Sequence, residues 1–346
     1  MNKQTAVKIP SHVATILPDM PAFKLTDDSI IIVESDGKEF VVGATATRYN
    51  PDGGRVFGGS VKDRHYQRLV CALLAKGLGE GDHEITMGLS AAKQFIDEFR
   101  AHKGSTALND EAVDMLAGVV KEIKYKVGSS DSPTKTCRVS LKPDESVHVL
   151  FETEAVCRVI PKKAKTYLLM QIGGGDWQSV VVVDGNMMHN THSRVEGVSG
   201  AQKKLASLLK LSRAETQEAW ISETRPNGMG GKRECCVVEK TRAANAYIFE
   251  QIPGILNNIE GYTDRIKAVV VSGGAVNDET FMSQLKEEMP QSLRVFTIKE
   301  LHAASSDDES TEIDPVFACA YGLASLGVGA ALDIGNSHLK GVFNVQ

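Results

Sequence analysis

The sequence has few of the features that mark membrane, secreted or nucleic-acid-binding proteins. No apolar run approaches the roughly 20 residues of a membrane-spanning helix, and residues 1–10 have no apolar core like that of a signal peptide. The formal net charge is -5 at pH 7, with basic residues scattered along the chain, which argues against a surface built mainly to grip nucleic acid. We therefore expect a cytoplasmic protein that contacts neither membrane nor nucleic acid directly.

Paired cysteines are lacking as well. The six cysteines are dispersed and include no C-x-x-C motif, so reduced core thiols are favoured over a disulfide framework. The composition is that of an ordinary globular protein, and 346 residues are enough for two domains, each with its own core.

The most informative stretch lies near residue 335, where a polar turn joins two apolar strands. Residues 331–334 have the pattern of a strand, and residues 339–343 that of a returning strand. The turn contains Gly335, Asn336 and Ser337. These small residues would let backbone N–H groups approach a phosphate, since glycine tolerates conformations that other residues avoid. The simpler interpretation is an ordinary surface hairpin with a polar tip.

Two charged residues flank this turn and suit the same ligand. Asp333, last but one in its strand, is placed to hold a magnesium ion through its waters. Lys340, on the returning strand, can reach a phosphate as a compact positive charge. The pair predicts the chemistry of a nucleotide's phosphate tail.

A second hairpin of the same type is expected around residue 174. Residues 167–172 and 180–183 are apolar and read as strands. Between them lie Gly173, Gly174, Gly175 and Asp176. Three consecutive glycines carry an entropic cost that a plain turn does not need, which favours the close approach of a ligand. Two such hairpins suggest an internal duplication.

Two further strand ends could contact a ligand. The apolar run 268–271 ends in Ser272, Gly273, Gly274 and Ala275, where backbone can abut a flat or anionic group. The short strand 147–150 delivers Glu152 to its carboxyl end, where open α/β sheets place ligand chemistry. Alternatively, Glu152 enters the first turn of the following helix, which its charge would favour. We also expect a single strand over residues 84–89.

Together, the D-x-G-x-x-x-x-K hairpin, the strand with three glycines and the strand ending in Gly-Gly-Ala resemble the phosphate 1, phosphate 2 and adenosine motifs of the actin superfamily of ATPases. Within it, the chain looks most like the ParM-type actins that segregate plasmids. The resemblance implies an α/β, actin-like (ribonuclease H-like), duplicated two-domain fold with the nucleotide in the interdomain cleft. The domains would be residues 1–163 plus 313–346, and residues 164–312.

The order of the motifs differs from that family. The phosphate 1 hairpin begins the family's chains, whereas here it follows all other motifs. Moving residues 331–346 ahead of residue 1 restores the usual order, with residues 8–13 as the third strand of the sheet. The chain therefore resembles a circularly permuted member.

The resemblance also assigns roles to individual residues. Asp333 matches the magnesium-associated aspartate, and Glu152 matches the residue that orients the attacking water. The matching phosphate contacts are Gly335, Asn336, Ser337 and Lys340 on one hairpin and Gly173, Gly174 and Gly175 on the other. The adenosine wall corresponds to Gly273, Gly274 and Ala275.

Two departures from the family concern catalysis. Gln171 and Gln178 stand where the family usually has acidic residues, and Asp176 is one possible substitute. Losing one well-placed electrostatic group can slow a reaction by about a hundredfold to a thousandfold. We therefore expect slow hydrolysis, with Glu152, Gln171 and Asp176 as the catalytic candidates.

The resemblance implies a filament-forming ATPase or GTPase that uses Mg²⁺, polymerises with itself and acts in plasmid segregation through a DNA-binding adaptor protein. Two alternatives remain open. One is a non-hydrolysing scaffold switched by nucleotide, which Gln171 and Gln178 favour. The other is a small-molecule kinase of the same fold, which would need an aspartate base that the sequence does not clearly supply.

Overall fold

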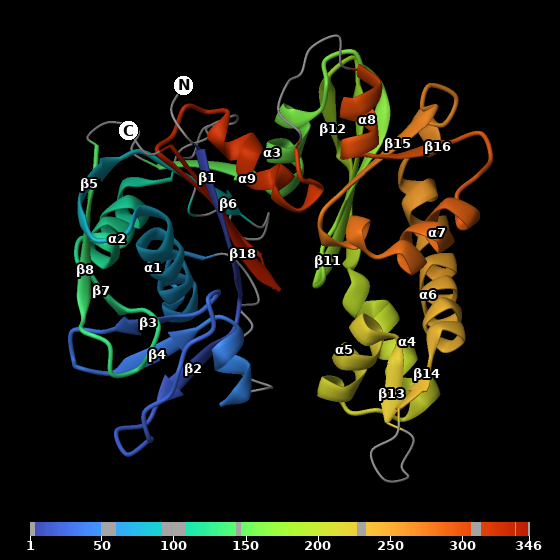
Figure 1. The fold of residues 1–346 in the computed structure, drawn as a ribbon. Coiled ribbons are helices and arrows are strands. Elements are labelled where there is room, and N and C mark those ends of the chain that lie inside the picture. Colours follow the sequence, from blue (N-terminus) through green and yellow to red (C-terminus); the bar gives the residue numbers. More distant parts are fainter. Residues whose placement is uncertain are drawn as a thin grey trace. The chain divides into compact units, whose positions relative to one another are not determined.

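The computed structural model describes residues 4–49, 60–91, 98, 108–142, 147–226, 233–305, 313–335 and 337–344. Asn336, one of the expected phosphate contacts, lies outside these ranges. The chain divides into two compact units (Figure 1). Unit 1 comprises Met1–Val159 and Cys319–Gln346, and unit 2 comprises Ile160–Ala318. The domain limits expected from the sequence stay a prediction.

Unit 1 contains a five-stranded sheet with the order β1-β18-β17-β6-β9. The strands are β1 (Gln4–Pro10), β18 (His338–Asn344), β17 (Ala330–Ile334), β6 (Met87–Ala91) and β9 (Val147–Phe151). β18 runs antiparallel to both β1 and β17, whereas β17, β6 and β9 are mutually parallel. The expected hairpin is therefore present, and the third strand is residues 4–10 rather than 8–13, because Pro10 ends it.

A second sheet of unit 1 has the order β2-β4-β3-β7-β8-β5. Its strands are β2 (Val13–Ile16), β4 (Glu39–Val42), β3 (Ile30–Val33), β7 (Ile123–Lys126), β8 (Lys135–Leu141) and β5 (Gly81–Ile85). The single strand expected over residues 84–89 is wrong. The chain leaves β5 after Ile85 and enters β6 at Met87, so the expected strand is divided between two sheets.

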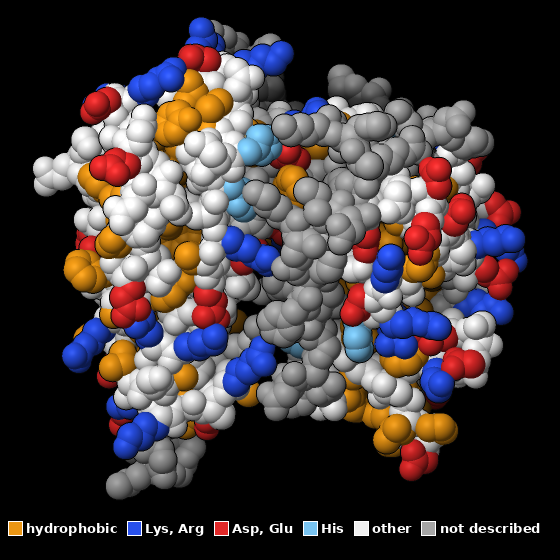
Figure 2. Space-filling model, turned by 180° about the vertical axis from the view of Figure 1, so that it is seen from behind, with side chains coloured by type: hydrophobic (Ala, Val, Ile, Leu, Met, Phe, Trp, Pro, Cys, Tyr) orange, Lys and Arg blue, Asp and Glu red, His pale blue; other side chains and the backbone are white. Residues whose placement is uncertain are grey.

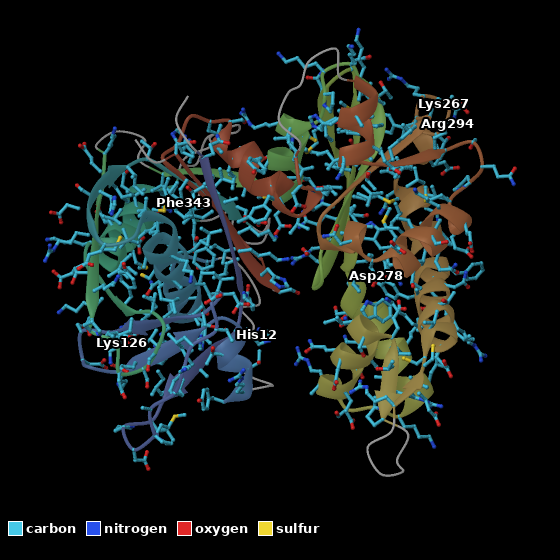
Figure 3. All side chains as sticks on the ribbon, viewed as in Figure 1. His12, Lys126, Lys267, Asp278, Arg294 and Phe343 are labelled. Carbon is cyan, nitrogen blue, oxygen red and sulfur yellow. The ribbon has the colours of Figure 1, made fainter. Side chains whose placement is uncertain are left out.

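The helices of unit 1 are α1 (Arg64–Leu78), α2 (Asp110–Val120), α3 (Glu152–Val159) and α9 (Ala318–Ala324), the last of which enters the unit at Cys319. Helix α1 packs on one face of the five-stranded sheet. A Cβ on Gly77 of α1 would lie 2.1 Å from the ring of Phe343 (Figure 3), so glycine lets helix and sheet approach closely. Helix α9 lies against β6, where a Cβ on Gly88 would be 3.3 Å from Leu323.

Unit 2 is built on a sheet with the order β12-β11-β10-β15-β16. The strands are β12 (Asn186–Glu196), β11 (Asp176–Val183), β10 (Tyr167–Ile172), β15 (Ala268–Ser272) and β16 (Arg294–Thr297). Its helices are α4 (Val198–Leu209), α5 (Arg213–Ser222), α6 (Val237–Asn258), α7 (Glu279–Glu288) and α8 (Ile298–Ser305). A small hairpin, β13 (Thr224–Pro226) with β14 (Arg233–Cys235), joins α5 to α6. The buried core includes Trp177, whose ring meets Phe281 edge-on.

The two five-stranded sheets have the same architecture. In each, an outer antiparallel strand is followed by the two strands of a glycine-containing hairpin and then by two parallel strands. In unit 2 the hairpin is formed by the first two strands along the chain, β10 and β11. In unit 1 it is formed by the last two, β17 and β18. The sheets thus support the internal duplication that the two hairpins suggest.

The surface and the cysteines agree with the composition. Figure 2 shows acidic and basic side chains interspersed over the visible face. All six cysteines are free, and four of them are buried. Among the described residues, no helix is both long and apolar enough to cross a membrane.

Candidate functional site

In unit 1, the turn between β17 and β18 is anchored by a serine from the segment after β1. The hydroxyl of Ser11 donates a hydrogen bond to the carbonyl oxygen of Gly335, and the N–H of Ser11 donates to the carbonyl oxygen of Ser337 at 3.0 Å. A Cβ on Gly335 would lie 2.8 Å from the carbonyl oxygen of His338. The turn is therefore compact, and it depends on a residue far away in the sequence.

Asp333 and Lys340 form a buried ion pair behind this turn. They are direct cross-strand partners, the carboxylate lies 2.6 Å from the Lys340 Nζ atom, and their side chains are 2% and 14% exposed. Burial opposes the charge of Lys340, but the attraction of Asp333 and its hydrogen bond outweigh this and raise the pKa of Lys340. Lys340 is therefore charged at neutral pH.

Two further residues hold the Asp333 carboxylate. Ser90, at the end of β6, donates from its hydroxyl at 2.9 Å and accepts from the N–H of Ile334 at 3.2 Å. Cys319 of α9 is buried, and its thiol hydrogen-bonds to Asp333. Burial, followed by the negative charges of Asp333 and Glu152, raises the pKa of this thiol well above its ordinary value, so it stays neutral. Sequence analysis missed both roles, because neither residue belongs to a recognisable motif.

Glu152 satisfies both of its sequence interpretations. It directly follows Phe151, the last residue of β9, and is also the first residue of α3. Its charge acts on both Lys340 and Cys319. Glu152 and Asp333 therefore share one edge of the unit 1 sheet, at the carboxyl ends of the parallel strands.

His338 gives this hairpin a pH-dependent contribution to stability. Burial, followed by repulsion from Lys8, Lys340 and His12, lowers the pKa of His338 from 6.5 to about 4. The folded protein thus disfavours the protonated form, which the unfolded chain adopts below pH 6.5. Stability is fully present above pH 6.5 and falls as the pH drops from about 6.5 towards 4, by at most about 3 kcal/mol.

We expect the His338→Asn variant to lose less stability than the wild type over this pH interval. Urea unfolding at several pH values between 7 and 4.5 measures the difference. Equal pH dependence in the two proteins would show that His338 does not carry the effect.

In unit 2, the triple-glycine turn lies on the N-terminus of α4. The carbonyl oxygens of Gly173, Gly174 and Gly175 accept hydrogen bonds from the N–H groups of Val198, Ser199 and Gly197 at 3.1, 2.8 and 3.2 Å. The N–H groups of Gly174 and Gly175 have no hydrogen-bond partner within the described ranges. Their carbonyl oxygens are thus fixed to the helix, while two amide donors stay available to an acceptor.

The strands beside this turn carry the catalytic candidate Gln171 and, opposite it, Gln178. Gln171 and Gln178 are direct cross-strand partners and are 5% and 6% exposed. The buried Oε1 atom of Gln171 has no hydrogen-bond partner among the described residues. Asp176 accepts from Gln178 Nε2 at 2.9 Å and from Arg194 Nε at 3.0 Å. Asp176 is therefore already paired with a cation, whereas the Gln171 oxygen is a buried acceptor without a donor in the described part of the chain.

The adenosine-type turn lies beside the triple-glycine turn. β10 and β15 are parallel neighbours, so both turns leave the same edge of the sheet. Gly273 has φ +96°, and a Cβ there would lie 2.4 Å from the carbonyl oxygen of Ile172, so only glycine fits. A Cβ on Gly274 would meet nothing within 4 Å, whereas Ala275 is buried. Gly274 therefore presents bare backbone to open space.

The predicted residues thus form one constellation in each unit. Unit 1 brings together Asp333, Gly335, Ser337, Lys340 and Glu152, and unit 2 brings together Gly173, Gly174, Gly175, Gln171, Asp176, Gly273, Gly274 and Ala275. Within the described ranges, no cluster of three or more His, Cys, Asp or Glu residues could hold a metal by itself. This donor set fits a hydrated Mg²⁺, which typically binds through one or two carboxylates together with substrate phosphates.

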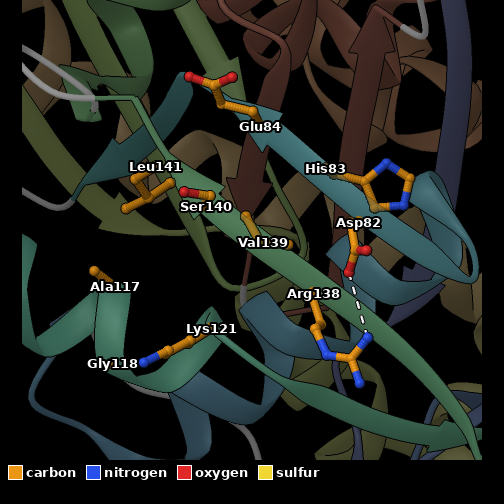
Figure 4. Close-up of a pocket in the computed structure, with 10 residues that line it drawn as sticks. All are labelled: Asp82, His83, Glu84, Ala117, Gly118, Lys121, Arg138, Val139, Ser140 and Leu141. Atoms are coloured by element: carbon orange, nitrogen blue, oxygen red, sulfur yellow. Dashed lines mark hydrogen bonds and ion pairs between the residues drawn. The ribbon is translucent and has the colours of Figure 1, made fainter.

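A different cavity of about 670 Å³ lies in unit 1 between β5, β8 and α2 (Figure 4). Its walls carry an ion pair between Asp82 and Arg138 at 3.4 Å, together with Lys121 and Glu84. The cavity belongs to the second sheet of unit 1, whereas the phosphate-type hairpin belongs to the five-stranded sheet. We therefore assign the candidate site to the glycine turns.

Comparison with known proteins tests the fold. No protein family model matches the sequence, and no curated protein matches it either. An archaeal actin homologue in complex with ADP superposes with a TM-score of 0.60 at 14% identity, covering 92% of this chain and 91% of the homologue. The actin-like protein Alp7A gives 0.58 at 14% identity, covering 92% of each chain. Bacillus thuringiensis ParM with AMPPNP gives 0.54 at 11% identity, covering 92% and 90%.

The chain therefore has an actin-like fold, which confirms the fold class expected from the sequence. The low sequence identities limit this result to the fold. The ParM type, the circular permutation and the roles of individual residues stay predictions.

Proposed function

We propose that the protein binds ATP or GTP with Mg²⁺, assembles into filaments and hydrolyses the nucleotide slowly. The observation that carries the proposal is in unit 2, where the N–H groups of Gly174 and Gly175 and the buried Oε1 atom of Gln171, on the strand that leads into their turn, have no partner among the described residues. This turn is the counterpart of the hairpin bearing Asp333 and Lys340 in unit 1. Neighbours of the same fold have been solved with ADP and with AMPPNP.

In this proposal the glycine hairpin of each unit can bind the phosphates of a nucleoside triphosphate. Lys340 and the glycine N–H groups bind its phosphates, and Gly273 and Gly274 form a wall for the base and ribose. Asp333 would hold a hydrated Mg²⁺, and the bound ion would neutralise charge that develops on the phosphates. Glu152 accepts a hydrogen bond from the attacking water and orients it. Gln171 supplies an amide where a carboxylate would organise the metal better, which makes hydrolysis slow.

Electron microscopy and pelleting of the purified protein, with and without Mg·ATP or Mg·GTP, test the proposal. We expect filaments that depend on nucleotide. A protein that neither binds nucleotide nor pellets in its presence would refute it. The likeness to ParM proteins supports the finer proposal of plasmid segregation through a DNA-binding adaptor, which pull-down from plasmid-bearing cells would test.

We expect the Gly274→Ala variant to separate binding from folding. The added methyl would meet no atom within 4 Å, so the free energy of unfolding should stay within about 0.5 kcal/mol of the wild-type value. The methyl would project to where the proposal places the nucleotide, and affinity should fall by about tenfold or more. Isothermal titration calorimetry measures the affinity. Unchanged affinity would remove Gly274 from the nucleotide wall.

A specific observation favours a second candidate, a nucleotide-switched scaffold that does not hydrolyse. The buried cross-strand pair Gln171 and Gln178 leaves no carboxylate at two positions where the family usually has one, and Asp176 is occupied by Arg194. Tight binding without phosphate release over hours selects this alternative. Faster release in Gln171→Glu would show that the missing carboxylate is the cause. No observation favours the kinase alternative over these two.

We also propose that the chain is a circular permutation. The strands of unit 2 follow the order β10, β11, β12, β15 and β16, and the equivalent strands of unit 1 are β17, β18, β1, β6 and β9. Only the transfer of β17 and β18 ahead of β1 makes the two orders equal. A variant with residues 329–346 fused ahead of residue 1 through a short linker should fold and bind as the wild type does. Failure to fold would contradict this equivalence.

A further inference from the structure

A row of charged side chains crosses three neighbouring strands of unit 1. Lys8 of β1 is the cross-strand partner of Lys340 of β18, which is in turn the partner of Asp333 of β17. Side chains of direct antiparallel partners project from the same face of a sheet. Lys8, Lys340 and Asp333 therefore share one face, and the family motif accounts for only the last two.

The row consists of two lysines and one aspartate. Asp333 compensates Lys340 at 2.6 Å, and like charges directly opposite each other, such as Lys8 and Lys340, are destabilising. His338 lies two residues before Lys340 and so projects from the same face. Burial, followed by repulsion from Lys8, Lys340 and His12, lowers the pKa of His338, and Asp28 acts in the opposite direction. An anion bound beside these side chains would reduce the repulsion between them.

The sheet face is also open at the Lys8 end. Over β6, α9 covers this face, because a Cβ on Gly88 would contact Leu323. On β1, however, Lys8 and Ala6 are exposed. An anion can therefore reach Lys8 without displacing a helix.

We propose that Lys8 is a further phosphate-binding residue, which contacts the terminal phosphate of a triphosphate bound at the β17–β18 turn. This inference rests on the proposed function. It adds that β1 helps the site to distinguish a nucleoside triphosphate from a diphosphate. Lys340 binds the phosphate chain from β18, and the flexible ammonium of Lys8 reaches it from the neighbouring strand.

Calorimetry with Mg·AMPPNP and Mg·ADP tests this on the full chain, for the wild type, Lys8→Gln and Lys8→Arg. Loss of one charge-assisted contact should weaken AMPPNP binding by about tenfold in Lys8→Gln while leaving ADP binding unchanged, and Lys8→Arg should retain most of the affinity. The matched control is Lys121→Gln, which removes an exposed lysine at the end of α2 in the same unit and should bind as the wild type does. Unchanged AMPPNP affinity in Lys8→Gln, or equal weakening of both nucleotides, would overturn the proposal.

Inorganic tripolyphosphate separates this inference from the proposed function. Suppose that the wild type binds tripolyphosphate about tenfold more tightly than Lys8→Gln does but binds no nucleotide. This result would support the anion site at Lys8 and refute the nucleotide proposal. Binding of neither ligand would refute both. As an independent readout, NMR titration of His338 should show a higher pKa with tripolyphosphate present, because the anion offsets the repulsion from Lys8 and Lys340. No change in that pKa would place the anion elsewhere.

Discussion

Replacement of Asp333 by alanine is expected to lower the free energy of unfolding of unit 1 by about 3–5 kcal/mol, because it leaves the buried Lys340 ammonium without its partner. The pair is 2.6 Å apart and its side chains are 2% and 14% exposed, so solvent cannot replace the lost interaction. The variant also loses the acceptor for Ser90. Urea unfolding followed by hydrogen exchange of β17 and β18 peptides measures the effect in this unit.

Two variants control the Asp333 experiment. Asp176→Ala removes a carboxylate of the other unit that is 15% exposed and whose partner, Arg194, is 39% exposed, so losing this ion pair should cost only about 0–1 kcal/mol. Losing the acceptor of the Gln178 amide should add about 1 kcal/mol. The double variant Asp333→Ala/Lys340→Met removes both charges and should recover part of the loss. Equal costs for Asp333→Ala and Asp176→Ala would show that burial does not set the strength of the first pair.

Replacement of Gly197 by alanine is expected to displace the triple-glycine turn from α4. The added Cβ would lie 2.2 Å from the carbonyl oxygen of Gly173 and 2.7 Å from that of Asp176, and backbone cannot move aside as a side chain can. We expect a loss of about 1–3 kcal/mol in stability from the overpacking. If the turn binds phosphate, nucleotide affinity should fall by at least about tenfold, since the free N–H groups of Gly174 and Gly175 would move.

Gly254→Ala is the matched control for this substitution. Gly254 lies within α6 of the same unit, and its added Cβ would meet nothing within 4 Å. Alanine favours a helix over glycine by about 1 kcal/mol, so this variant should be slightly more stable and bind as the wild type does. Thermal unfolding measures the stability of both variants, and calorimetry measures their nucleotide affinity. A Gly197→Ala protein as stable as the wild type would contradict the contact between the turn and α4.

The parts of the fold that the sequence predicts are those with a local signal. Both glycine hairpins have apolar strands on either side of a small-residue turn, and both are present. Glu152 comes directly after β9, and the local sequence pattern also predicts this position at a strand end. The single strand expected at residues 84–89 was wrong because a continuous strand-like pattern cannot show where a chain passes from one sheet to another.

The missed side chains depend on register and on distant packing. Ser90 meets Asp333 because β6 pairs with β17, which lies some 240 residues later in the chain. Cys319 reaches the same carboxylate from a helix, and Lys8 is aligned with Lys340 only through the pairing of β1 with β18. A single sequence contains no signal for such pairings, so these three residues emerge only from the tertiary structure.

The placement of β17 and β18 also has a consequence for biosynthesis. Unit 2 is one continuous segment, so its strands can assemble on the ribosome as soon as Ala318 has emerged. The five-stranded sheet of unit 1 must wait longer, because its middle strands are translated last while β1 and β6 are translated early. Until then, the edges of β1 and β6 stay uncovered, and chaperones that shield unpaired strands should associate with the nascent chain during this interval.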